Sequence, residues 1–297
     1  MIILYYDKLL LAYYCSIIYF MSETANYARS NGLQLLEAAI QKFGPIFTID
    51  QVETLAEQDV PRSRLRWYLS ALIRSGRLEP LKRGTYALKN PPPGTEIHPF
   101  AIAMALVQPA AISHWSALVH HGFTTQMPKM VQVSVPGKVM TPEMRRGETY
   151  QPRGRTVWRA LGMEIEIILI QPRAFFGHQK IWVSSWKQVV ITDPERTVLD
   201  LVARPEVFGG LSAALDILEE ILPRINLQGL VRYGLDYQVG AVIKRLGWCL
   251  ENLRVAEDLL MPLQHVPVHN MTLLDPHASA STVINERWQV NENLRRE

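Results

Sequence analysis

The sequence predicts an α+β protein in which an N-terminal winged helix-turn-helix domain is joined to a larger mixed α/β C-terminal domain. Three observations indicate this fold: three helical patterns followed by a basic hairpin, a proline-rich break near residue 91, and a mixture of helix and strand patterns beyond it. The chain has 297 residues, of which 48% are hydrophobic and 20% are charged. These values are ordinary for a soluble globular protein with two domains.

Three helical patterns open the first domain, which we place at residues 22–90. The first covers about 32–43, and the second covers about 49–57 with Thr48 as the expected N-cap. The third begins at Pro61, which suits a first helical turn, and it ends at Gly76. Its apolar face, at helical spacing, consists of Leu65, Tyr68, Leu69, Leu72 and Ile73.

A short hairpin follows the third helix. Residues 78–81 and 85–88 are the expected strands, and Lys82-Arg83-Gly84 is the turn between them. Helix, helix, basic helix and basic hairpin, in that order, is typical of a winged helix-turn-helix. In such a domain the third helix enters the major groove of DNA, while the wing contacts phosphate or the minor groove.

Positive charge is concentrated on this segment. Residues 61–89 contain eight basic residues and one acid, a net charge of +7 in a chain whose total is +3, so the rest sums to about −4. Such a concentration indicates a surface for a polyanion. The alternatives are a merely solvated face or a protein-binding three-helix unit. The residues predicted to bind double-stranded DNA are Arg62, Ser63, Arg64, Arg66, Trp67, Ser70, Arg74, Lys82, Arg83 and Tyr86.

The first 21 residues differ from the rest of the chain. Their continuous apolar run, 9–20, is shorter than the roughly 20 residues that a membrane span needs. We therefore interpret residues 1–21 as an apolar extension that arises from a mis-assigned start, with Met21 as the true start, and we expect no membrane partner. The alternative is a membrane-tethered regulator. The two cysteines, Cys15 and Cys249, exclude a disulfide scaffold and fit a cytoplasmic protein.

A proline-rich linker, residues 91–94, separates the first domain from a second domain at 95–297. Helical patterns of the second domain cover 100–107, 110–121, 193–204 and 210–221, with weaker ones over 228–258. Strand patterns cover 131–135, 163–170, 181–184 and 188–191.

No set of catalytic residues assembles from these patterns. Asp193, Glu195 and Asp200 could hold a metal ion, as in a metal-dependent nuclease, but Asp193 and Glu195 fit better as the start of a helix. We expect His114 to be a cap or a surface residue. Ser113 and His114 are not expected to form a catalytic pair, because neighbours on a helix point in different directions. The sequence therefore predicts no enzyme, no metal and no cofactor.

Several motifs resemble the AbiEi family of antitoxins, which belong to type IV toxin–antitoxin and abortive-infection systems. The resemblance extends over nearly the whole chain from about residue 33, without a counterpart for the first twenty residues. Ser and Ala at 278–281 replace the glycine that usually follows the LDP element. The matching motifs are LEPLKRGTY at 78–86, ISHWSALVHHG at 112–122, TDPERTVLDLV at 192–202, LLDP at 273–276 and RWQVN at 287–291.

The resemblance implies two roles for the protein. The first domain would bind inverted repeats in its own promoter and repress transcription. The second domain would counter a nucleotidyltransferase-like toxin, without the need for a stable complex. From the residues alone, a ligand-sensing winged-helix regulator remains an alternative to this function.

Overall fold

The computed structural model describes residues 31–56, 60–91, 95–148, 155–267 and 270–294. Within these ranges the chain forms two compact units, one that ends at His98 and one that begins at Pro99. The predicted extension at 1–21 lies outside the described residues, as do 22–30 of the predicted first domain and most of the predicted linker. None of the described helices is long and apolar enough to cross a membrane.

The first unit contains helices and one three-stranded antiparallel sheet. A helix over 31–43 precedes β1 (Ile46–Thr48), α2 (Ile49–Glu53), α3 (Arg62–Arg74), β2 (Leu78–Lys82) and β3 (Thr85–Leu88). The strand order is β1-β3-β2. Strand β1 was not predicted, because three residues between two helices are too few to show alternation.

Apolar residues of the helices and the sheet form the core of this unit. Leu65 and Leu69 of α3 pack with Phe47 of β1 and Val52 of α2, and each of these side chains is almost fully buried. The capping box predicted in part at Thr48 is present: the Thr48 hydroxyl accepts from the Gln51 amide at 3.2 Å, and the Gln51 side chain accepts from the Thr48 amide at 2.8 Å. The cap fixes the start of α2.

The second unit contains a six-stranded mixed sheet. Its strands are β4 (Ala111–Ile112), β5 (Val131–Val135), β6 (Thr156–Ala160), β7 (Met163–Leu169), β8 (His178–Ser184) and β9 (Lys187–Thr192). Their order is β6-β7-β5-β4-β9-β8, with β5–β7 and β4–β9 parallel and the other pairs antiparallel. Strand β6 was not predicted.

The helix predicted over residues 110–121 is wrong in its first half. Ala111 and Ile112 form β4, which lies between β5 and β9 in the sheet, and helix α5 begins only at His114 (His114–His120). Both residues of β4 are fully buried. Pairing with two neighbouring strands therefore overrides the helical spacing of this segment.

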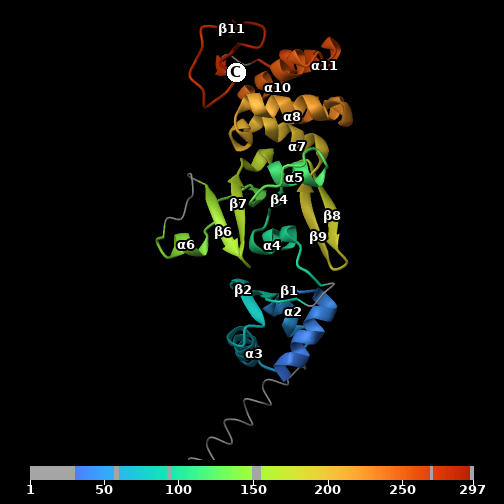
Figure 1. Ribbon diagram of the computed structural model, residues 1–297, viewed down its shortest axis with the longest axis vertical. Helices are drawn as coiled ribbons and strands as arrows, with labels where there is room; N and C mark the ends of the chain where they lie inside the picture. Colours follow the sequence, from blue (N-terminus) through green and yellow to red (C-terminus); the bar gives the residue numbers. More distant parts are fainter. Residues whose placement is uncertain (1–30, 57–59, 92–94, 149–154, 268–269, 295–297) are drawn as a thin grey trace, which may run out of the picture. The chain divides into compact units, whose positions relative to one another are not determined.

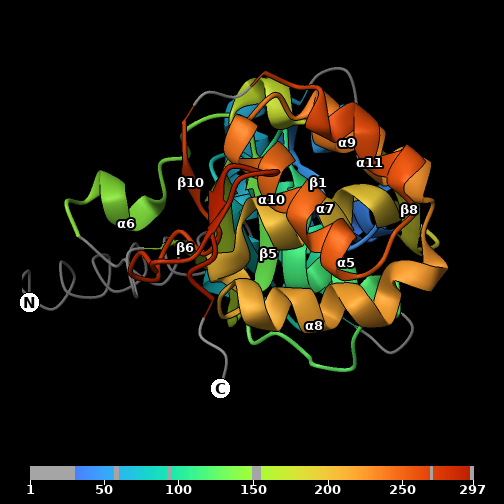
Figure 2. The ribbon, with the colours of Figure 1, turned by 90° about the horizontal axis from the view of Figure 1, so that it is seen from above.

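Helices of the second unit cover one end of its sheet. Figure 1 shows α7, α8, α10 and α11 stacked beyond the strands, and Figure 2 looks down onto this layer. Helix α7 contacts α5, α8, α9 and α10, which makes it the central helix of the unit. The helix bounds are α4 Pro99–Leu106, α6 Pro142–Arg145, α7 Pro194–Ala203, α8 Leu211–Ile221, α9 Leu227–Asp236, α10 Gly240–Asn252 and α11 Glu257–Gln264.

A small sheet after α11 brings the two tail motifs together. Strand β10 (Thr272–Leu273) pairs in parallel with β12 (Val290–Asn291), and β11 (Ile284–Asn285) pairs antiparallel with β12. The Trp288 ring then lies so close to α10 that a Cβ atom on Gly247 would be 2.0 Å from it. Only glycine at position 247 leaves room for this ring.

Candidate functional site

The third helix of the first unit presents its polar face to solvent. Its apolar residues face the core, whereas Ser63, Arg64, Arg66, Trp67, Ser70 and Arg74 are exposed. Trp67 is 46% exposed, which is high for so large an apolar side chain. The exposed residues among the predicted DNA contacts of α3 therefore share one accessible helix face.

Two glycines position the ends of this basic segment. Gly76 has φ +72° and ends α3, with the Arg77 amide donating to the Leu72 carbonyl at 3.0 Å. Gly84 has φ +75° at the hairpin turn, and its carbonyl accepts from the Ile49 amide at 2.9 Å. The turn that carries exposed Arg83 is thus fixed against the start of α2.

Arg62 differs from the other predicted DNA contacts. Its guanidinium pairs with Asp50 and with Glu53 of α2, each at 2.5 Å, and both carboxylates raise its pKa. These two contacts join α3 to α2 and compensate the charge of Arg62. A contact with DNA would require Arg62 to exchange these carboxylates for phosphate, so its place among the DNA-facing residues stays a prediction.

Two predicted contacts in the hairpin are only half exposed. Tyr86 packs against the core of the first unit, with its ring centroid 6.5 Å from that of Phe47. Lys82 is half-buried, and this burial lowers its pKa. Arg77 and Lys89, which contribute to the predicted basic segment but were not assigned as contacts, are both exposed.

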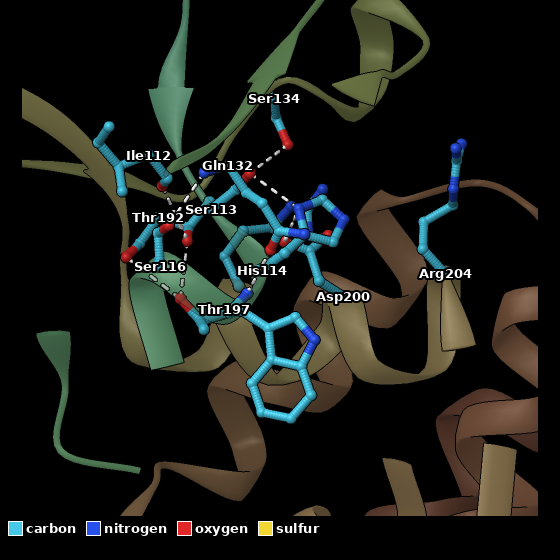
Figure 3. Close-up of polar contacts among 12 residues, drawn as sticks. Ile112, Ser113, His114, Ser116, Gln132, Ser134, Thr192, Thr197, Asp200 and Arg204 are labelled. Carbon is cyan, nitrogen blue, oxygen red and sulfur yellow. Dashed lines mark hydrogen bonds and ion pairs between the residues drawn. The ribbon is translucent and has the colours of Figure 1, made fainter. Parts of the chain in front are cut away.

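A second polar cluster is buried within the second unit, where β4, β5 and α5 meet α7 (Figure 3). The Ser113 hydroxyl lies 2.8 Å from His114 Nδ1 and also accepts from the Ser134 hydroxyl at 2.8 Å. His114 is fully buried, and its φ of +53° is unusual for a residue other than glycine. The expectation that His114 is a cap or a surface residue is therefore wrong, since the N-cap of α5 is Ser113.

The expectation that Ser113 and His114 point in different directions, as neighbours on one helix, is also wrong. It assumed that both residues belong to one helix, but Ser113 has an extended backbone and precedes α5. Their contact does not form a nucleophile–base–acid relay, because Asp200 lies 3.9 Å from the same Nδ1 atom that contacts Ser113. Burial lowers the pKa of His114, and the Arg196 cation lowers it further, against the opposing effect of Asp200.

Asp200 forms a buried ion pair with Arg196 one helical turn before it. The Arg196 guanidinium also lies 5.5 Å from the ring centroid of Phe176 and 5.2 Å from that of Tyr237. An adjacent buried contact joins Gln132 to Glu166 at 2.8 Å. The cluster therefore connects the sheet with α7, and within it the buried atoms His114 Nε2, Arg196 Nε and Asp200 Oδ2 have no hydrogen-bond partner among the described residues.

The three carboxylates considered for a metal site point to different partners. Asp193 caps α7, as predicted: it accepts from the Arg196 amide at 2.8 Å and from the Tyr233 hydroxyl at 2.7 Å. Glu195 accepts from the Asn226 amide at 2.9 Å. With Asp200 paired to Arg196, no three metal-ligating side chains converge among the residues that the structure describes.

Burial and the hydrogen bond to Asp193 raise the pKa of Tyr233 to about 12.

Comparison with known proteins identifies the second unit. Residues 110–252 match the family model described as the AbiEi antitoxin C-terminal domain, a stretch that contains β4 to α10 and the buried polar cluster. The class of protein is thus that of the antitoxins. The second unit therefore contains an AbiEi antitoxin C-terminal domain, as the sequence motifs predicted.

The chain also resembles a solved structure. It is similar to the crystal structure of the RV2827C protein from Mycobacterium tuberculosis, with a TM-score of 0.55 and 16% identity over 86% of this chain and 88% of that one. At this identity the likeness shows a shared fold alone. No curated protein matches the sequence.

Proposed function

We propose that the protein is a cytoplasmic, DNA-binding autorepressor and antitoxin of a type IV toxin–antitoxin system. In this proposal the first unit is a winged helix-turn-helix domain that binds inverted repeats in the protein's own promoter. The second unit counters a nucleotidyltransferase-like toxin, and this effect does not require a stable complex. The family of the second unit supports the antitoxin role.

The observation that carries the DNA-binding proposal is the exposed cationic face of α3 beside the basic hairpin. Arg64, Arg66 and Arg74 extend from one helix into solvent, and Arg83 extends from the hairpin turn. No ion pair involves these four side chains among the described residues. Their charge is therefore available for phosphates and for the acceptor atoms of guanine.

The order of elements also supports a winged helix. The order along the chain is a helix, β1, α2, α3 and the β2–β3 hairpin. In a winged helix this order makes α3 the recognition helix and the turn at Arg83 the tip of the wing. In this arrangement Ser63, Arg64, Arg66, Trp67 and Ser70 face the base edges or their backbone. Arg74, Lys82, Arg83 and Tyr86 then lie near phosphates and set the register.

A salt-titrated shift assay tests the DNA-binding proposal. The full chain is mixed with DNA from immediately upstream of its own gene, with random DNA as competitor. We expect tight binding that resists the competitor and weakens steeply with salt. An R64A/R66A double variant should lose this binding, whereas K129A, a change of an exposed cation in the second unit, should keep it. Binding no tighter than to random DNA would contradict autorepression.

The antitoxin role has a separate test. Co-expression of the toxin encoded beside the gene should arrest growth, and the full chain should restore it. The R64A/R66A variant should restore growth equally well, because its changes lie outside the family-matched residues 110–252. Failure of the unchanged chain to restore growth would contradict the antitoxin proposal while leaving the DNA-binding proposal intact.

A further inference from the structure

Two acidic side chains lie within the cationic surface of the first unit. Asp50 and Glu53 of α2 both pair with the Arg62 guanidinium at the start of α3, each at 2.5 Å. The Asp50 side chain is 74% exposed and that of Glu53 is 41% exposed, so neither carboxylate balances a buried charge. Exposed ion pairs of this kind contribute little to the stability of a fold. The main effect of the two acids is therefore on the charge of this surface.

The backbone fixes the position of Asp50. The Ile49 amide, one residue earlier, donates to the Gly84 carbonyl at 2.9 Å, which holds the start of α2 against the hairpin turn that carries Arg83. Through its side chain, Asp50 also contacts Arg62 at the start of α3. Asp50 therefore connects the two elements that are proposed to contact DNA, the third helix and the hairpin.

The paired acids also lie near a proposed base contact. Arg66 follows Arg62 by one helical turn, so both side chains leave α3 on the same side. Arg66 is exposed and pairs with no described carboxylate, whereas Arg62 pairs with two. In a helix-turn-helix the first residues of the recognition helix lie closest to the base edges. One cation and two acids, a net charge of −1, are thus placed beside the path proposed for DNA.

We propose that Asp50 and Glu53 restrain DNA binding by the first unit, an inference that rests on the proposed function. Phosphate must compete with two carboxylates for the Arg62 guanidinium, and the excess negative charge repels the DNA backbone. The restraint acts on phosphate contacts, which are the same for every sequence, and leaves the base contacts of Arg64 and Arg66 unchanged. Base contacts therefore supply a larger share of the remaining affinity, as a repressor that must find one operator among many other sites requires.

Fluorescence anisotropy of the full chain with a labelled duplex of random sequence tests this inference. D50N/E53Q removes both charges with little change of shape, and it should bind this duplex about 5- to 50-fold more tightly at low salt. The dependence of log K on log salt concentration should steepen by about 1, because Arg62 gains a phosphate contact. R62A in the same background should remove this steepening. The control is D216N/E219Q, an equal change of net charge at exposed acids of α8, which should leave affinity and slope as they are.

Several outcomes would overturn the inference. D50N/E53Q could match the unchanged chain in affinity and slope, or D216N/E219Q could give an equal gain, which would assign the effect to net charge alone. A steeper slope that persists after R62A would contradict the release of Arg62. The single variants D50N and E53Q should each give part of the gain, and they decide the question if circular dichroism shows that the double variant has lost its helices.

This test and that of the proposed function give separate answers. The preference of the unchanged chain for its operator over random DNA tests autorepression. The restraint by Asp50 and Glu53 is measured on the random duplex alone, so either result can fail without the other.

Discussion

Neighbouring arginines on α3 have different electrostatic surroundings. Arg62 is held by Asp50 and Glu53, whereas Arg64 and Arg66 extend from the same helix without carboxylate partners among the described residues. A guanidinium that already pairs with two acids has little left to gain from phosphate. The structure thus separates residues that the basic pattern of the sequence groups together.

We predict that R64A or R66A costs roughly 1–3 kcal/mol of binding free energy at one base pair of the operator. K82A/R83A should instead weaken binding to all sequences and lower the salt slope, because the hairpin contacts phosphates in the proposed complex. R62A is the matched control on the same helix and should change DNA affinity least. Shift assays on specific and random DNA measure each effect. An equal loss of DNA affinity for all these variants would contradict the division into base-reading and phosphate-contacting residues.

The buried ion pair of Arg196 and Asp200 gives a stability prediction. D200A leaves the Arg196 charge buried without its partner, so we expect a loss of about 3–5 kcal/mol in the free energy of unfolding. D216A, a change of an exposed carboxylate on α8, should have almost no effect. Urea unfolding followed by circular dichroism measures both variants, and a D200A loss below about 1 kcal/mol would rule out this account.

At the scale of the element, the end of α3 depends on a left-handed glycine. Gly76 has φ +72°, and a Cβ atom added there would meet no atom within 4 Å. G76A should therefore lower the free energy of unfolding by about 1–2 kcal/mol through backbone strain alone. G137A is a matched control, since position 137 is equally open but does not have a positive φ. Equal melting curves for the two variants would contradict this explanation.

Elements whose apolar residues recur with a clear helical or strand period could be predicted from the sequence. Elements that exist only because neighbouring strands pair with them could not. Helix α3 and strand β5 appear where their apolar spacing indicates. Strands β1 and β4 are three and two residues long and exist because neighbouring strands bind them. The position of His114 follows from β4, so its burial beside Asp200 could not be predicted from a helical pattern.

At the scale of the whole molecule, one buried histidine and one half-buried histidine predict sensitivity to acid. Burial lowers the pKa of His114, and burial together with the Arg196 cation lowers that of His178 to about 4. The unfolded chain therefore binds protons near pH 6.5 that the folded chain does not, so stability is lost as the pH falls below about 6.5.

Denaturant midpoints between pH 7.5 and 4 measure this loss. H178Q should reduce the decline of the midpoint with falling pH, because it removes one group that takes up a proton on unfolding. H277Q, a change of an exposed histidine, should leave the decline as it is. A midpoint that rises as the pH falls would contradict the proposed coupling between histidine protonation and unfolding.

The packing of the Trp288 ring against α10 has a consequence for protein synthesis. The ring covers Gly247, which the ribosome adds to the chain 41 positions earlier, and Trp288 also donates to Glu251 of α10 at 2.7 Å. Until Trp288 emerges from the ribosome, the side of α10 at Gly247 stays exposed to solvent. The first unit has already been translated by then. The nascent second unit is therefore open to chaperones and proteases until Trp288 has emerged, so the yield of folded protein depends on this step.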